Sequence, residues 1–357
     1  MKTATFFKPV ILSLFLLLHF SACQELYDPQ LEIDKQYLVV QGLLTTDAPG
    51  MVILSTASVF GHTRHRTSVW DATVHIETGQ GEMIRLTGFH QDGIYYTPYD
   101  FKGEVGETYV LHVETRDGFI YQSKPQTIQP PIQVASMDAA TGKDYQYFPS
   151  SVSDRLFQRE IEGTHVYIEP EMTVGNGLKY RFTTNLYLQY TISVDGGMGP
   201  PAIDYCWEKR EVTNLVRRDV SHEETSRLRT AFIPRYGHQM HHFNFPRLDY
   251  QSHRMAVLRL FSLNSDSYAY YSARYKQLSD AGKIFDPIAA QIPGNMYCVN
   301  DENQLVFGLF ETSSVQQETF RLIVNYATGE ATILPRYLDD PIPVQGCLRE
   351  ETPPFWL

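Results

Sequence analysis

The sequence predicts a mainly β protein, in which a small sandwich is followed by a larger β-rich domain with one or two helices. The chain is rich in aromatic residues, with 23 Tyr and 20 Phe, and strands favour aromatic and β-branched residues. Short apolar segments recur between positions 37 and 124, with Gly, Asp or Pro between nearly every pair, as in short strands joined by turns. Later segments are longer and also alternate apolar with polar residues, which is typical of half-buried strands.

The first 22 residues predict export. They contain two lysines, no acidic residue and an apolar core that ends at Phe20, which is the pattern of a secretory signal. This core is shorter than the roughly 20 apolar residues that span a bilayer. The run Phe20-Ser21-Ala22-Cys23 is similar to a bacterial lipobox, so we expect residues 1–22 to be removed and Cys23 to be lipidated. A plain signal peptide that leaves a free cysteine is the alternative.

Residues 23–33 are expected to form a tether between the lipid and the folded part. Glu25, Asp28 and Glu32 follow Cys23 closely, and this stretch resembles the acidic tag that sends some lipoproteins to the cell surface. An ordinary solvated tether explains the same residues equally well.

The overall charge argues against a nucleic-acid partner. The chain has 30 Lys and Arg against 41 Asp and Glu, a formal net charge of -11, and such a surface repels phosphate backbones. At 357 residues the chain is too long for one ordinary domain, so we expect two.

Residues 34–124 predict an immunoglobulin-like β-sandwich, because they contain seven short strand-like segments. Asp117-Gly118 joins the last two, and such a pair favours a tight hairpin turn. We expect Tyr109 to pack in the core or at a corner of the sandwich, with a ligand contact as the alternative. The predicted strands are 37–45, 51–59, 72–79, 82–88, 93–98, 107–115 and 119–124.

Residues 125–133 are predicted to be a linker, because they contain three prolines, and residues 134–357 a β-rich C-terminal domain. A helix is expected after position 264, with Ser265 or Asp266 as its cap. Tyr268, Tyr271 and Tyr275 would share one face of it and pack on a sheet; a carbohydrate platform is the alternative. The predicted strands are 164–172, 178–194, 204–212, 254–264, 303–312 and 318–328.

Candidate site residues gather in the second domain. His238, His241 and His242 could bind a transition metal, or form a polar surface loop. The candidate recognition residues, beside the Gly- and Pro-rich run at 193–201, are Tyr190, Tyr205 and Trp207. Recognition residues concentrate on loops held by rigid strands, so we expect the second domain to bind the partner and the first to position it.

No motif predicts catalysis or a cofactor. The sequence has no P-loop, nucleophile elbow, zinc-protease helix or dinucleotide-binding glycine set, so we expect no enzyme, no catalytic residue and no cofactor. Besides Cys23 there are three cysteines, Cys206, Cys298 and Cys347. In an exported protein this count suggests one disulfide and one free thiol, and the pairing stays open.

Several sequence blocks together resemble a known family. After the lipobox come "YLVVQGLLT", "GEVGETYVLHVETRDG", "CWEK", "DAGKIFDPIAAQIPGNMYC" and "PPFWL". In this order they are similar to a lipoprotein family of the Bacteroidota that is catalogued only as a domain of unknown function. Members usually have further cysteines near the C-terminus, where this chain has only Cys347. The family offers no catalytic residues to carry over.

The resemblance implies a function in uptake. Members of the family tend to be encoded beside TonB-dependent outer-membrane receptors. The chain is therefore expected to be a non-enzymatic, lipid-anchored protein of the outer-membrane surface that assists such a transporter in nutrient capture. The alternative is a surface adhesin or glycan-binding lipoprotein that acts alone.

Overall fold

The computed structural model of the chain is mainly β, with one helix among the residues that it describes. All of these residues belong to one compact unit. No helix within them is long and apolar enough to cross a membrane. The described residues are 37–57, 67–88, 91–149, 156–171, 179–194, 202–211, 228–234, 254–280, 292–325, 328–335 and 346–349.

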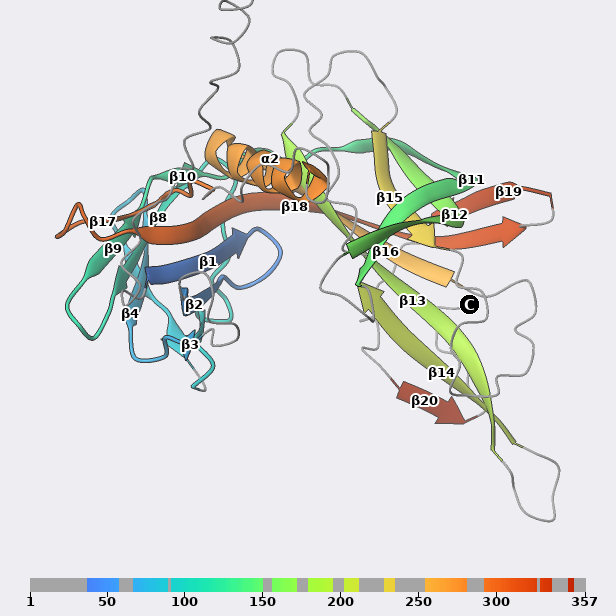
Figure 1. The fold of residues 1–357 in the computed structure, drawn as a ribbon, viewed down its shortest axis with the longest axis horizontal. Coiled ribbons are helices and arrows are strands. Elements are labelled where there is room, and N and C mark those ends of the chain that lie inside the picture. The colour runs from blue at the N-terminus through green and yellow to red at the C-terminus, as the bar shows by residue number, and fades with distance from the viewer. Residues whose placement is uncertain are drawn as a thin grey trace, which may run out of the picture. The chain divides into compact units, whose positions relative to one another are not determined.

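The first part of the chain forms short strands close to the predicted ones (Figure 1). The strand predicted at 37–45 is β1, Tyr37–Thr45. The turn predicted at Asp117-Gly118 is present, with Gly118 at φ +86. The other strands are β2 (Met51–Ala57), β3 (Thr67–Ser68), β4 (Thr73–Thr78), β5 (Met83–Arg85), β6 (Thr87–Gly88), β7 (Ile94–Tyr96), β8 (Thr108–Glu114), β9 (Ile120–Ser123) and β10 (Gln126–Thr127).

The later part contains longer strands and the helix α2, Ser265–Asp280. The strands are β11 (Val134–Pro149), β12 (Leu156–Pro170), β13 (Tyr180–Val194), β14 (Ala202–Glu211), β15 (Leu228–Pro234), β16 (Arg254–Ser262), β17 (Met296–Cys298), β18 (Val306–Asn325), β19 (Glu330–Pro335) and β20 (Gly346–Arg349). The sequence predicted two strands in place of β18; the structure joins them into one strand of 20 residues.

The described strands form three sheets. The largest has 11 strands, in the order β20-β14-β13-β16-β18-β1-β2-β7-β6, with β19 beside β18 and β3 beside β2. A six-stranded sheet has the order β17-β9-β8-β4-β5 with β10 beside β8, and a three-stranded sheet has the order β11-β12-β15.

Two cores share the large sheet. The first lies between its β1 and β2 end and the six-stranded sheet, with Val40, Leu54, Ile76 and Leu111 fully buried. The second lies between its β13, β16 and β18 strands and the three-stranded sheet, and it buries Phe232. Each core therefore packs against a different half of the same sheet.

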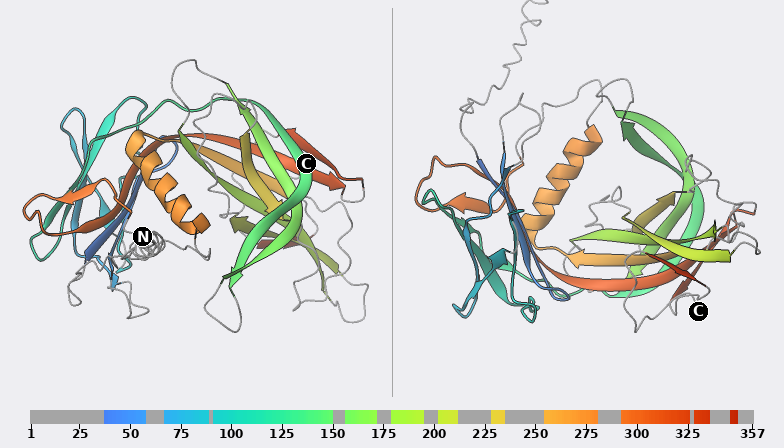
Figure 2. Two further views of the ribbon diagram at one scale, coloured as in Figure 1. Left: turned by 45° about the horizontal axis from the view of Figure 1, so that its top comes forward. Right: turned by 90° about the horizontal axis from the view of Figure 1, so that it is seen from below.

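Strand β18 belongs to both halves. Its residues 306–313 pair in parallel with β1, and residues 314–322 pair antiparallel with β16. In Figure 2, β18 is the long orange-red strand that runs from beside the blue β1 into the other half of the sheet. Gly308 has φ +103, and a Cβ there would overlap the carbonyl oxygen of Val40. Only glycine therefore fits where β18 passes β1.

The predicted division at 125–133 stays a prediction. Ile128 belongs to the first core and Ile132 to the second, so the chain crosses from one core to the other here. It later returns, because β17 pairs with β9 and β18 with β1. The first core is thus completed by residues from the end of the chain.

Helix α2 begins earlier than predicted, by one residue relative to a cap at Ser265 and by two relative to a cap at Asp266. The side-chain oxygen of Asn264 accepts a hydrogen bond from the Ser267 N–H at 2.9 Å, so Asn264 is the cap. The two predicted caps have other partners: Ser265 Oγ accepts from Lys179 Nζ, and Asp266 accepts from Gln126. The predicted cap was therefore wrong: Asn264 is also a residue type that caps helices, and tertiary contacts engage the side chains of Ser265 and Asp266 instead.

Tyr109 lies at a corner of the first core, as predicted. It is buried, and its hydroxyl accepts a hydrogen bond from the Glu104 N–H at 2.9 Å. Its ring packs edge-on against Phe101 with centroids 6.3 Å apart. Burial raises the pKa of this phenol above its ordinary value, so it remains neutral and holds the loop before β8.

Candidate functional site

The candidate functional site is the face of the six-stranded sheet that points away from the first core. Side chains of a strand alternate between the two faces of a sheet, and Tyr121, Leu111 and Ile76 point into the core. Their neighbours in sequence therefore point outward. We call this outward surface, made by Tyr297, Val299, Ile120, Gln122, His112, His75, Glu77, Arg85 and Met83, the outer face.

Three apolar side chains lie together at one end of the outer face. Ile120, Tyr297 and Val299 are 39%, 43% and 50% exposed. The Val299 N–H donates to the Ile120 carbonyl at 2.7 Å, and Tyr297 pairs with Gln122 across β17 and β9. β17 is the terminal strand of this sheet, so the apolar group borders an edge.

Asn300 fixes this apolar end to the hairpin of β8 and β9. Its side-chain oxygen accepts from the Ile120 N–H at 3.0 Å, and its Nδ2 donates to the Gly118 carbonyl at 2.8 Å. One side chain thereby ties the end of β17 to a turn distant in sequence. The apolar group is held on a rigid support.

Polar side chains continue the outer face across the sheet. Tyr297, Gln122, His112, His75 and Arg85 occupy successive register positions on β17, β9, β8, β4 and β5. The Tyr297 hydroxyl donates to Gln122 Oε1 at 3.2 Å. His112 Nε2 lies 2.8 Å from Glu77 Oε2, and both side chains are partly exposed.

This combination suits recognition of a macromolecule. Exposed apolar groups provide area that a partner can bury, and the neighbouring imidazole, amide and carboxylate groups provide directed hydrogen bonds. Elsewhere, a hollow of about 240 Å³ lined by Ser136, Asp138, Tyr167, Ile168 and Glu169 is smaller than a typical pocket for a small organic ligand.

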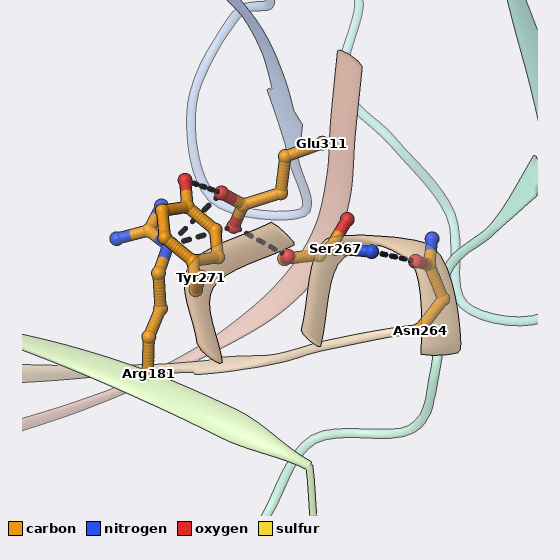
Figure 3. A network of polar contacts seen from close by, with 6 residues as sticks. Arg181, Asn264, Ser267, Tyr271 and Glu311 are labelled. Carbon is orange, nitrogen blue, oxygen red and sulfur yellow. Dashed lines mark hydrogen bonds and ion pairs between the residues drawn. The ribbon is translucent and has the colours of Figure 1, made fainter. Parts of the chain in front are cut away.

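A buried polar network supports the helix beside β18 (Figure 3). Glu311 is only 2% exposed at its side chain. Both of its oxygens accept from Arg181 Nε, at 3.0 and 2.9 Å. Ser313 donates to Oε1 at 2.7 Å and Tyr271 donates to Oε2 at 2.6 Å. The carboxylate is thus satisfied from β13, from its own strand and from α2.

The ionisation states of Arg181 and Tyr271 suit their buried positions. Burial alone would lower the pKa of Arg181, but Glu311 more than offsets it and the pKa is raised. The Arg181 guanidinium also lies 3.7 Å from the centroid of the Phe261 ring, a favourable cation–π position. Burial raises the pKa of Tyr271, so it stays a donor. The predicted packing of the tyrosine face is confirmed at Tyr271, and the network holds α2 in place.

The predicted recognition residues lie on adjacent strands. On β13 and β14, Tyr190 pairs with Cys206, the residue between Tyr205 and Trp207. The register brings the three backbone positions together. The loop at 195–201 lies outside the described residues, so their role stays a prediction.

The other predicted site residues are placed as follows. His238, His241 and His242 lie outside the described residues, as do Cys23 and the whole of 1–36. Among the residues that are described, no three His, Cys, Asp or Glu side chains gather to hold a metal ion. Cys298 is a buried free thiol, and its Sγ lies 3.3 Å from Asn300 Oδ1.

The outer face was missed by sequence reasoning. Alternation showed that β8 and β9 have two faces, but not which of them stays uncovered. The exposed Tyr297 belongs to a strand of three residues that has too few positions to show a period.

Comparisons with known proteins give one match. Residues 24–319 match the model of a family described as "Domain of unknown function (DUF4249)". The match begins directly after Cys23 and includes the whole of the first core, whereas Phe320, Leu322 and Val324 of the second core lie beyond its end. No curated protein and no solved structure matches the chain.

Proposed function

The chain belongs to this family of domains of unknown function, and on that premise we propose that it is a lipid-anchored surface protein of the outer membrane. In this proposal Cys23 carries the lipid, and the protein is a non-enzymatic accessory of a TonB-dependent transporter in nutrient capture. The lipobox-like run before Cys23 supports the anchor. Several acyl chains hold a protein on a membrane without any spanning helix, at about 0.8 kcal/mol for each buried methylene.

The observation that carries the binding role is the outer face. Ile120, Tyr297 and Val299 are exposed together beside partly exposed polar groups on a rigid sheet. A cluster of this kind fits a protein partner, because apolar anchors surrounded by polar groups are typical of interfaces. We propose that the outer face contacts the transporter, which differs from the sequence-based expectation that the second domain binds the partner.

We further propose that the first part of the chain is an immunoglobulin-like sandwich that presents this face. Its short strands surround one core, and the Tyr109 hydroxyl bonds to backbone a few residues upstream, as in the tyrosine corner of such domains. A fold of this kind carries no chemistry by itself; it would position the outer face.

Affinity capture tests the binding role. The full chain, tagged and expressed in its native host, is recovered from outer membranes solubilised in detergent, and co-purifying proteins are identified by mass spectrometry. We expect a TonB-dependent receptor at low and moderate salt. The variant Ile120→Glu/Tyr297→Glu should lose it. The control Tyr99→Glu alters a tyrosine that is 90% exposed elsewhere and should retain it.

The outcomes separate the parts of the proposal. Recovery of no receptor at any salt concentration would exclude the transporter role and favour the stand-alone adhesin. Equal recovery by all three proteins would leave the role intact and move the contact away from the outer face. The anchor is tested separately: Cys23→Ser should release the protein from the membrane fraction or leave its precursor uncleaved.

A further inference from the structure

We propose that Cys206 and Cys347 form a disulfide that fastens β20 to β14. The two strands are antiparallel, and the register pairs Cys206 directly with Cys347. Residues directly opposite in antiparallel strands have Cα atoms about 4.5 to 5.5 Å apart. This separation lies within the range of about 4.4 to 6.8 Å that disulfides span.

The third cysteine is placed elsewhere. Cys298 lies on β17 in the six-stranded sheet and pairs with Tyr121 of β9, whereas Cys206 and Cys347 lie on neighbouring strands of the large sheet. Cys298 is buried in the first core, and its thiol is within hydrogen-bond distance of Asn300. The topology thus resolves the pairing that the sequence left open.

The bond would secure a short strand at the end of the large sheet. β20 has four residues, and β14 is its only partner among the described strands. Hydrogen bonds over so few residues hold an edge strand weakly. The bond would also close a loop that contains β15, β16, α2, β17, β18 and β19, and closing a long loop restricts the unfolded chain strongly.

Formation needs an oxidant, which an exported protein meets as a thiol–disulfide oxidoreductase outside the cytoplasm. One cysteine thiolate attacks the disulfide of the oxidant, and one oxidant sulfur leaves as a thiolate. The other cysteine thiolate then attacks the mixed disulfide. The Cys206–Cys347 bond forms, and the two oxidant sulfurs leave as a dithiol that carries the two protons given up by the cysteines. This step rests on the export assumed in the proposed function.

Peptide mapping tests the bond on the full chain. Protein purified in detergent is denatured without reductant, alkylated with iodoacetamide and digested with trypsin, which places the three cysteines in separate peptides, 182–209, 284–321 and 337–349. We expect the first and third peptides to be linked and Cys298 to be alkylated. Alkylation of both Cys206 and Cys347, or a link to Cys298, would overturn the proposal.

A second experiment tests the Cys206–Cys347 pairing without assuming that the protein is exported. The reduced, folded full chain is exposed to glutathione disulfide and mapped in the same way. The register predicts the same link, so its absence here would refute the pairing even if the native host supplied no oxidant.

Variants supply matched controls. Cys206→Ser should make Cys347 open to alkylation, and Cys347→Ser should do the same for Cys206. Each should lower the melting temperature by about 5 to 10 °C, and the double variant should lower it no further. Cys298→Ser should keep the link. A double variant that melts well below both single variants would contradict a shared bond.

Discussion

Phe310 and Phe320 lie on the same strand, β18, yet each is fully buried in a different core. Phe310 packs in the first core and Phe320 in the second. One strand therefore contributes side chains to both cores. A substitution at either ring reports on the stability of the core in which that ring lies.

Truncation of either ring should lower the free energy of unfolding by a similar amount, but it should loosen a different core in each case. We expect Phe310→Ala and Phe320→Ala each to lower the free energy of unfolding by about 3 to 5 kcal/mol, from lost burial and the cavity left behind. Hydrogen exchange should localise the effect. Phe310→Ala should speed exchange at Leu111, and Phe320→Ala at Val166. Equal acceleration at both sites by both variants would show that the cores open as one.

Gly308 should tolerate no side chain. Gly308→Ala must accommodate a Cβ that meets backbone of Val40, at a positive φ. Gly118 is the matched control, because its φ of +86 is also positive but nothing lies within 4 Å of the added atom. We expect Gly118→Ala to cost about 1 kcal/mol and Gly308→Ala about 3 kcal/mol or more. Urea unfolding would measure both. Equal costs would mean that the pairing of β1 with β18 shifts easily.

In the polar network under α2, loss of the Glu311 carboxylate should destabilise the protein far more than loss of the Tyr271 hydroxyl. Glu311→Ala leaves the Arg181 guanidinium buried without a counter-charge, and such a loss costs about 3 to 5 kcal/mol. Tyr271→Phe removes one donor while Arg181 and Ser313 still serve the carboxylate, so we expect about 1 kcal/mol. Denaturant unfolding distinguishes the two. A cost for Tyr271→Phe as large as that for Glu311→Ala would contradict this order.

His165 should make the protein less stable in mild acid. Burial chiefly, and Arg229 next, lowers the pKa of its imidazole. Arg229 Nη1 lies 3.3 Å from His165 Nδ1, so the ring accepts there and donates through Nε2 to the Lys143 carbonyl. The unfolded chain takes up this proton near pH ~6.5, before the folded protein does. The contribution of His165 to the free energy of unfolding is therefore complete above that pH and decreases below it.

The pH dependence follows from this sign. The free energy of unfolding should fall as pH drops below ~6.5, by at most about 1.4 kcal/mol per pH unit from this group. His165→Gln should flatten that part of the profile. Urea unfolding at several pH values between about 5 and 8 checks it, and parallel profiles for the two proteins would count against the assignment.

The local features of the fold could be predicted from the sequence, but its long-range pairings could not. Alternation and flanking turn residues located β1 and the hairpin at Gly118, because both depend on neighbouring residues. The parallel pairing of β1 with β18 depends on residues from opposite ends of the chain, and no local pattern records it. Two apolar segments were separated at residues 313–317, where Ser and Gln interrupt the pattern; β18 continues through them because it changes partner there.

The candidate site was harder to predict than the fold. Glu311 was visible as a single acid in an apolar run, a signal that a buried partner was needed, but Arg181 is 130 positions away. The exposure of Ile120 and Tyr297 depends on which face of a sheet the rest of the chain covers. Cys206 and Cys347 became a pair only through strand register.

If the chain is exported as proposed above, the parallel pairing of β1 with β18 also sets the order in which it folds during secretion. Of the described strands, β1 would then leave the translocation channel first, whereas its partner β18 would emerge after all but β19 and β20. Contacts so distant in sequence form slowly. Until β18 arrives, β1 is paired with β2 on one edge only. Its other edge is unpaired, and an unpaired edge attracts other chains. We therefore expect nascent molecules to need a holding chaperone until β18 has crossed the membrane.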